Sequence, residues 1–212
     1  VVLAFKELAI DSRVLWTALA DSLTVLVIGF SAAIVVGTLF GVLMGRFRLL
    51  EYVLDPYVSF LYALPTVVIM PLLIIWIGIG STTRVAIVFS TSLVPVLLNT
   101  MAGAKLVSQD LIDVARNYGA TNRQTLRSIV VPAILPYFFA GLNVASGTAL
   151  IGMVLGEMLL VIRGLGGLIV EYSNFFRTDR MFVALLAIVA LSVAFRSGIR
   201  RLRGALMPWS EV

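Results

Sequence analysis

The sequence contains no cysteine and no histidine among its 212 residues. Their absence excludes thiol redox chemistry, metal sites built from cysteine or histidine, and acid–base catalysis by histidine. Charged residues are also scarce, at 13% of the chain, whereas a soluble protein has about 25%. The hydrophobic residues, 60% of the chain, are collected in long runs. The composition therefore indicates an all-α, polytopic helical membrane protein.

Catalytic and nucleotide-binding motifs are absent as well. The chain has no phosphate loop of the form GxxxxGK[ST], and no set of residues typical of an active site. The run from Gly164 to Gly167 is more typical of a turn than of a ligand cradle. We therefore expect neither an enzymatic activity of its own nor a bound cofactor, metal ion or nucleic acid.

Apolar segments long enough to cross a membrane recur along the chain, since a hydrocarbon core of about 30 Å needs about 20 helical residues. We expect about five spans, over approximately residues 22–45, 57–77, 83–101, 129–160 and 181–195. Asp21 and Ser22 are suitable caps for the first of them, and residues 1–21 are expected at an interface. Because the chain begins abruptly at Val1, we expect that one further span precedes it.

The basic residues are unevenly distributed between alternate loops, and this bias predicts the orientation. Ten lie in segments expected to face the cytoplasm: Arg46, Arg48, Lys105, Arg116, Arg123, Arg127, Arg196, Arg200, Arg201 and Arg203. Six lie in the opposite segments: Lys6, Arg13, Arg84, Arg163, Arg177 and Arg180. The carboxyl terminus is therefore expected in the cytoplasm and the loop over residues 161–180 outside.

Small residues recur at every fourth position of the first span. They are Gly29, Ala33, Gly37, Gly41 and Gly45. This spacing places them on one stripe of a helix, where another helix can approach closely. The stripe serves either packing within the chain or an interface with a second subunit.

Polar residues inside the spans are candidates for a translocation path, because burying them in a membrane is costly. The candidates are Asn143, Ser146 and Glu157. Asn143 and Ser146 can instead form hydrogen bonds between helices. Glu157 is either hydrated near the interface, or lines a cavity, or pairs with a basic residue such as Arg163 or Arg84.

A polar insert at about residues 105–130 separates two apolar segments. Its centre reads DVARNYGATNRQTLRSIVVP over residues 113–132, and its charged side chains cannot face lipid. We expect a short helix over about residues 110–118, ended by Gly119 in the left-handed conformation, and a second helix from about residue 121. Tyr118 is suited to anchor a partner protein. The alternative is a solvated amphipathic loop on the lipid headgroups.

The polar insert resembles the cytoplasmic signature of binding-protein-dependent ABC importer permeases. That signature reads approximately Glu-Ala-Ala, three residues, Gly, nine residues, Ile, one residue and Leu-Pro. The same spacing here holds Asp113, Val114, Ala115, Gly119, Ile129, Val131 and Pro132. Aspartate in place of glutamate is a weaker helix former, and the two valines replace alanine and leucine.

Further segments are similar to the nitrate, sulfonate and taurine branch of this family. They are Leu54-Asp55-Pro56, Ala63-Leu64-Pro65, Trp76 to Gly80, Gly156-Glu157-Met158, Gly164-Leu165-Gly166 and Met207-Pro208-Trp209. The resemblance implies a type I ABC importer permease fold, one transmembrane domain over residues 1–212, in a bacterial inner membrane. The ATPase-coupling residues would be Asp113, Ala115, Arg116, Tyr118, Gly119, Arg123 and Pro132.

The resemblance also implies partners. They are a second permease subunit, expected as a homodimer, two cytoplasmic ATPase subunits that carry ATP and magnesium, and an extracytoplasmic solute-binding protein. The cargo would be a small solute such as a sulfonate, nitrate or taurine. The alternative function is a secondary carrier or channel that works without ATPase subunits. A membrane-embedded enzyme is disfavoured because no catalytic set is present.

Overall fold

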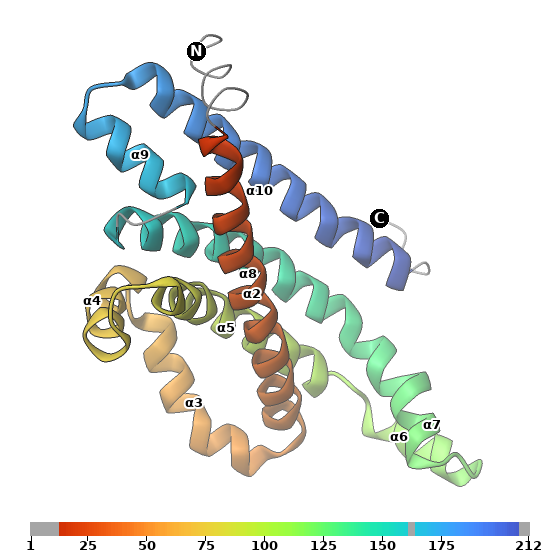
Figure 1. Cartoon of the computed structure of the whole chain (residues 1–212). Coiled ribbons are helices and arrows are strands. Elements are labelled where there is room, and N and C mark those ends of the chain that lie inside the picture. Colours follow the sequence, from red (N-terminus) through yellow and green to blue (C-terminus); the bar gives the residue numbers. More distant parts are fainter. Residues whose placement is uncertain (1–12, 161–163, 208–212) are drawn as a thin grey trace. The chain divides into compact units, whose positions relative to one another are not determined.

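The computed structural model describes residues 13–160 and 164–207, and within these ranges every regular element is helical (Figure 1). The helices are α2 (Val14–Arg46), α3 (Arg48–Ala63), α4 (Thr66–Ile77), α5 (Ser81–Lys105), α6 (Gln109–Asn117), α7 (Asn122–Thr125), the π-helix η2 (Leu126–Val130), α8 (Val131–Leu160), α9 (Leu165–Asn174) and α10 (Thr178–Leu206). The all-α prediction is confirmed.

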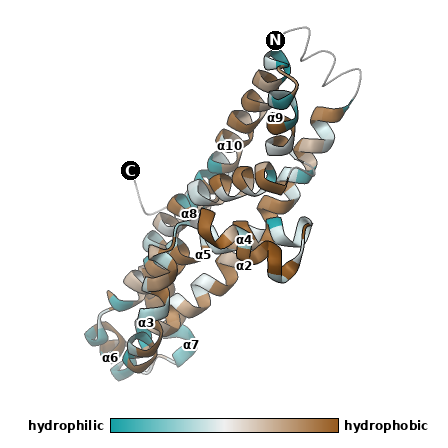
Figure 2. Cartoon of the chain, turned by 90° about the vertical axis from the view of Figure 1, so that its left-hand side faces the viewer, coloured by the Kyte–Doolittle hydropathy of each residue, from teal (hydrophilic) through white to brown (hydrophobic). Residues whose placement is uncertain are grey.

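Four helical stretches are long and apolar enough to cross a membrane. They are α2, α5, the continuous stretch Asn122–Leu160 and α10, and the broken pair of α3 and α4 raises the number to five if it forms one span. Figure 2 shows that these helices are mostly hydrophobic, whereas hydrophilic residues gather on α6 and α7. The structure thus agrees with the expectation of about five spans.

The first span begins earlier than predicted. Its helix starts at Val14, so Asp21 and Ser22 lie inside α2 and do not cap it. The cap prediction was wrong because the Ser22 hydroxyl is fully buried and donates to Glu157 at 2.9 Å. The Ser22 hydroxyl is used in a hydrogen bond to another helix and does not cap the amino end of α2.

The second predicted span, over residues 57–77, is not continuous. Helix α3 ends at Ala63, and Pro65 has extended backbone angles, φ −60° and ψ 127°, before α4 begins. Proline has no amide hydrogen to donate, and it disfavours a helical conformation at the residue before it, here Leu64. The span predicted over residues 57–77 is therefore wrong as a single helix, because Pro65 separates two helices.

The described chain divides into two compact units. The first contains the described parts of Val1–Ala32, Leu64–Ser92 and Ser146–Gly198, and the second those of Ala33–Ala63, Leu93–Ala145 and Ile199–Val212. In the first unit Phe30 packs edge-on against Phe195, with ring centroids 5.1 Å apart. The second unit has a core in which Met44, Val58 and Leu97 are buried.

The small-residue stripe of α2 packs against α5 inside each unit. In the second unit, a Cβ atom added to Gly41 would lie 2.6 Å from the Leu97 carbonyl oxygen. In the first unit, a Cβ atom added to Gly29 would lie 2.8 Å from Val88. The stripe therefore serves contacts within the chain, as the first of the two interpretations predicts.

Candidate functional site

The polar insert contains a helical hairpin whose first helix, α6, ends in a left-handed glycine. The amide of Gly119 donates to the Arg116 carbonyl and that of Ala120 to the Ala115 carbonyl, each at 2.9 Å. This pair of bonds is a Schellman motif, and Gly119 has φ 79°. No atom lies within 4 Å of a Cβ added at Gly119. The position therefore requires conformational freedom and not space.

The second helix of the hairpin, α7, begins with a capping box. The Thr121 amide donates to Gln124 Oε1 at 2.8 Å, and the Gln124 amide donates to Thr121 Oγ1 at 3.3 Å. The two bonds satisfy amide groups that the start of a helix otherwise leaves without partners. The predicted bounds of the first helix and the predicted start of the second agree with the structure to within one residue, and both ends of the turn are held by specific hydrogen bonds.

Tyr118 is the single aromatic residue of the hairpin sequence, residues 109–130, and 90% of its surface is accessible. Asp113 and Arg116 form an exposed ion pair at 3.9 Å, so Arg116 pairs within its own helix. Arg123 is exposed on α7. A shallow pocket beside Tyr118 is lined by Ala115, Tyr118, Gly119, Ala120, Gln124, Thr125, Ser128 and Ile129. The exposed tyrosine and the pocket together form a surface suited to a partner protein.

The hairpin is attached to other helices of the second unit. Arg46, at the end of α2, donates to Gln109 Oε1 at 3.0 Å, and Lys105 pairs with Glu51 of α3. Sequence analysis missed both contacts, because they join residues far apart in the chain. The first contact joins α6 of the hairpin to α2, and the second joins the end of α5, just before the hairpin, to α3.

Pro132 lies at the joint between the hairpin and α8, not on the hairpin surface. It follows the π-helix η2, in which the Val131 amide donates to the Leu126 carbonyl. Proline cannot donate the next hydrogen bond of a regular helix, and π-turns are a known means of accommodating such a gap. The helix therefore accommodates Pro132 with a wider turn just before it.

A second polar cluster, the Glu157 network, lies in the first unit. It consists of Ser22, Arg84, Glu157, Leu165 and Gly166. Glu157 is fully buried, and its Oε2 atom accepts from the Ser22 hydroxyl and from the Gly166 amide, each at 2.9 Å. The Ser22 hydroxyl oxygen accepts from the Leu165 amide at 2.9 Å. The carboxylate therefore binds at the amino end of α9, where the helix dipole favours a negative charge.

Arg84 supplies the compensating charge for Glu157. Its Nη1 atom lies 3.8 Å from Glu157 Oε1, and only 3% of the arginine is accessible. Of the two basic partners that the sequence suggests, the structure confirms Arg84, while Arg163 lies outside the described residues. Glu157 is thus fully buried beside a compensating charge and is not an isolated charge.

Two glycines make room for this carboxylate. A Cβ atom on Gly164 would lie 2.3 Å from the carboxyl carbon of Glu157, and one on Gly166 would lie 2.9 Å from the Cβ atom of Glu157. The glycine run forms the predicted turn at Gly164, where φ is 95°. It then continues into α9, a helix that the sequence analysis did not predict. The glycine run therefore surrounds the Glu157 side chain of the same protein and not a bound ligand.

The other two path candidates lie in different surroundings. Asn143 is exposed and Ser146 is fully buried. Both residues belong to α8, which is one of the membrane-crossing stretches. Their assignment to a translocation path stays a prediction.

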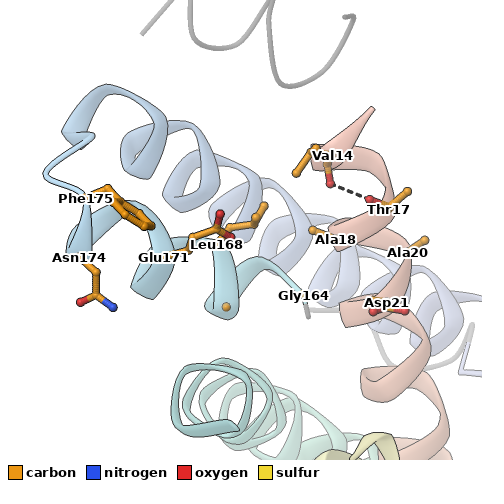
Figure 3. A pocket seen from close by; sticks show the side chains of 11 residues that line it. Val14, Thr17, Ala18, Ala20, Asp21, Gly164, Leu168, Glu171, Asn174 and Phe175 are labelled. Carbon is orange, nitrogen blue, oxygen red and sulfur yellow. Dashed lines mark hydrogen bonds between the residues drawn. The ribbon is translucent and has the colours of Figure 1, made fainter. Parts of the chain in front are cut away.

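A groove in the first unit lies between α2 and α9, and we call it the α2–α9 groove (Figure 3). Its volume is about 880 Å³, and it is lined by Val14, Thr17, Ala18, Ala20, Asp21, Gly164, Gly167, Leu168, Glu171, Asn174 and Phe175. Among the described residues, the lining contains two carboxylates, Asp21 and Glu171, and no basic side chain. Phe176, next to its rim, is 88% exposed and has φ 55°, which is uncommon for a bulky residue.

Comparison with known proteins gives consistent results along nearly the whole chain. A family model described as "Binding-protein-dependent transport system inner membrane component" matches residues 33–206. The taurine transport system permease protein TauC of Escherichia coli is 31% identical over 92% of this chain and 71% of its own length. The riboflavin transport system permease protein RibX of Chloroflexus aurantiacus is 32% identical over 95% and 75%. The nitrate import permease protein NrtB of Synechocystis sp. is 29% identical over 88% and 68%.

Proposed function

Because this chain belongs to the family of inner membrane components of binding-protein-dependent transport systems, we propose that its polar insert is the docking surface for ATPase subunits. The chain is a permease subunit of an ATP-driven ABC importer. The observation that carries the proposal is the capped hairpin that presents Tyr118, 90% exposed, between two membrane-crossing stretches.

The construction of the hairpin supports a mechanical role. Both sides of its turn are held by specific hydrogen bonds, the Schellman motif at Gly119 and the capping box at Thr121. A rigid element transmits a displacement, whereas a flexible loop absorbs it. An aromatic side chain buried in a partner's pocket contributes a large part of binding energy at such interfaces. The exposed Asp113–Arg116 pair adds little energy of its own.

In the proposed mechanism, closure of the ATPase subunits around ATP moves the hairpins of two permease subunits toward each other. This rigid-body motion opens the translocation path to the outside. ATP and magnesium stay on the ATPase subunits, and this chain has no ATPase site of its own. Asn143 and Ser146 are the proposed polar residues of the path.

We assign two identical permease chains to the complex, as the simplest arrangement for a chain of this family. The bias of basic residues supports a cytoplasmic polar insert and a cytoplasmic carboxyl terminus. The α2–α9 groove then lies on the outside, where its carboxylates Asp21 and Glu171 are suited to basic side chains of a solute-binding protein.

Replacement of Tyr118 by alanine tests the docking surface. We expect wild-type permease in mild detergent to recover ATPase subunits, and the Tyr118→Ala variant to recover at least about tenfold less, since such anchors contribute about 2 kcal/mol or more. The matched control is Tyr52→Ala, which removes another exposed tyrosine, 82% accessible, outside the insert.

The amount of ATPase subunit that elutes with the permease in size-exclusion chromatography measures the interaction. Equal recovery with Tyr118→Ala would remove this tyrosine from the interface. If the wild-type chain recovers no ATPase subunit, the docking function itself is wrong. ATP-independent uptake would then favour the secondary carrier.

A further inference from the structure

Arg196 of α10 packs on α8 at a glycine. A Cβ atom added to Gly147 would lie 2.9 Å from Nη2 of Arg196, and both residues belong to the first unit. Because Gly147 has no side chain, the guanidinium of Arg196 can approach the backbone of α8 at this position. Arg196 is at the same time exposed on its other side.

The guanidinium lies beside Gly147, near the middle of α8, and both α8 and α10 belong to membrane-crossing stretches. At 1.5 Å per residue, Gly147 lies about 20 Å from the end of α8 at Leu160, and the backbone of Arg196 about 27 Å from the start of α10 at Thr178. Side chains of a helix lean toward its amino end, and the length of an arginine side chain covers the remaining difference of about 7 Å. A depth of about 20 Å falls inside a hydrocarbon core of about 30 Å.

This position is not that of an interfacial anchor. A snorkelling arginine extends its head toward the nearer interface, which for Arg196 is the carboxyl end of α10, whereas its contact with Gly147 directs the guanidinium the other way. Within residues 13–160 and 164–207, no carboxylate pairs with Arg196. A cation at this depth is costly unless it has a function or a partner.

We propose that Arg196 is a specificity-determining residue, which receives the anionic group of the transported solute inside the membrane. The proposal rests on the function proposed above and adds the class of solute. A guanidinium presents parallel donors that match the oxygens of a sulfonate or nitrate. Two of the relatives are named for taurine and nitrate, which carry such groups, and one for riboflavin, which is uncharged at neutral pH. Arg196 assigns this chain to the carriers of solutes that bear an anionic group, such as a sulfonate or nitrate.

The test measures ATP-dependent uptake of labelled taurine, nitrate and riboflavin by the complete complex in proteoliposomes. We expect the wild-type complex to take up taurine or nitrate. Uptake is expected to fall about tenfold or more in Arg196→Gln, because one charged hydrogen bond is lost. It is expected to be largely retained in Arg196→Lys. Gly147→Ala is expected to reduce uptake as well, because its methyl group displaces the guanidinium. Arg201→Gln, an exposed arginine of the same helix, is the control and is expected to transport normally.

A second measurement does not depend on the ATPase subunits. Taurine or nitrate is expected to raise the unfolding temperature of the purified wild-type permease, and to raise that of Arg196→Gln less. No anion-dependent shift in the wild type, uptake of riboflavin alone, or normal anion uptake by Arg196→Gln would each overturn the proposal. The proposal would also be overturned if Arg196→Gln transported normally and differed from the wild type only in the loss of a co-purified phospholipid, since Arg196 would then bind a lipid headgroup. Failure of ATPase recovery, in contrast, contradicts the docking function and leaves the anion-dependent shift as the separate test of Arg196.

Discussion

At the scale of single residues, Glu157 illustrates how the first unit accommodates a buried carboxylate. One carboxylate oxygen accepts hydrogen bonds from Ser22 and Gly166, and the other faces Arg84. Each donor comes from a different helix, so the charge joins α2, α5, α8 and α9. A buried pair of this kind is weak evidence for net stabilisation, but removing one partner leaves an uncompensated charge.

Replacing one partner of Glu157 is therefore expected to destabilise the protein strongly. We expect Arg84→Met to lower the free energy of unfolding by about 3–5 kcal/mol, measured by denaturation of the purified protein in detergent. The double variant Arg84→Met/Glu157→Gln is expected to recover part of this loss, because it buries no unpaired charge.

Glu171→Gln is the control, since it changes an exposed carboxylate of α9. It is expected to change the free energy of unfolding by less than about 0.5 kcal/mol. If Arg84→Met is no more destabilising than this control, the ion pair has no structural role.

At the scale of elements, the polar insert is a case in which local sequence determines local structure. Its glycine turn and its capping box each depend on residues within a few positions of one another. The broken pair of α3 and α4 shows the same rule at Pro65, because a proline interrupts a helix through its own ring and its effect on the preceding residue. Helix α9 shows the opposite case. Its start at Gly164 is fitted around Glu157, and no local pattern predicts that contact.

The turn at Gly119 yields a test of the insert as a mechanical element. We expect Gly119→Val to abolish coupled uptake while the protein stays folded, because a β-branched residue resists the left-handed conformation by about 1–2 kcal/mol. Gly119→Asn is the matched control, since asparagine tolerates this conformation and space for a side chain is available. ATP-dependent uptake in proteoliposomes measures the difference. Normal uptake by Gly119→Val would show that the left-handed turn is dispensable.

At the scale of the whole molecule, the arrangement across the membrane follows from the basic residues. Without Arg196, whose guanidinium is assigned to the membrane, nine basic residues against six still predict a cytoplasmic polar insert and an outside position for the loop before α10. Tyr118 and Phe176 are suitable reporters for the two sides, because they are 90% and 88% exposed.

The absence of native cysteine makes this topology directly testable. In intact cells, a membrane-impermeant maleimide is expected to label Phe176→Cys and to leave Tyr118→Cys unlabelled. In inverted membrane vesicles the pattern is expected to reverse. Labelling of Tyr118→Cys from outside would contradict the orientation and, with it, the cytoplasmic docking surface.

The sequence by itself determined the class of the protein, its membrane-crossing stretches and the polar insert. These features depend on composition, on helical periodicity and on hydrogen bonds between near neighbours, such as those around Gly119 and Thr121. Only the tertiary structure decided that α2 continues through Ser22, that the stripe on α2 packs against α5, and that Glu157 binds the start of α9. Ser22 and Glu157 are 135 positions apart, and no local preference specifies which distant helix supplies the partner of a buried charge.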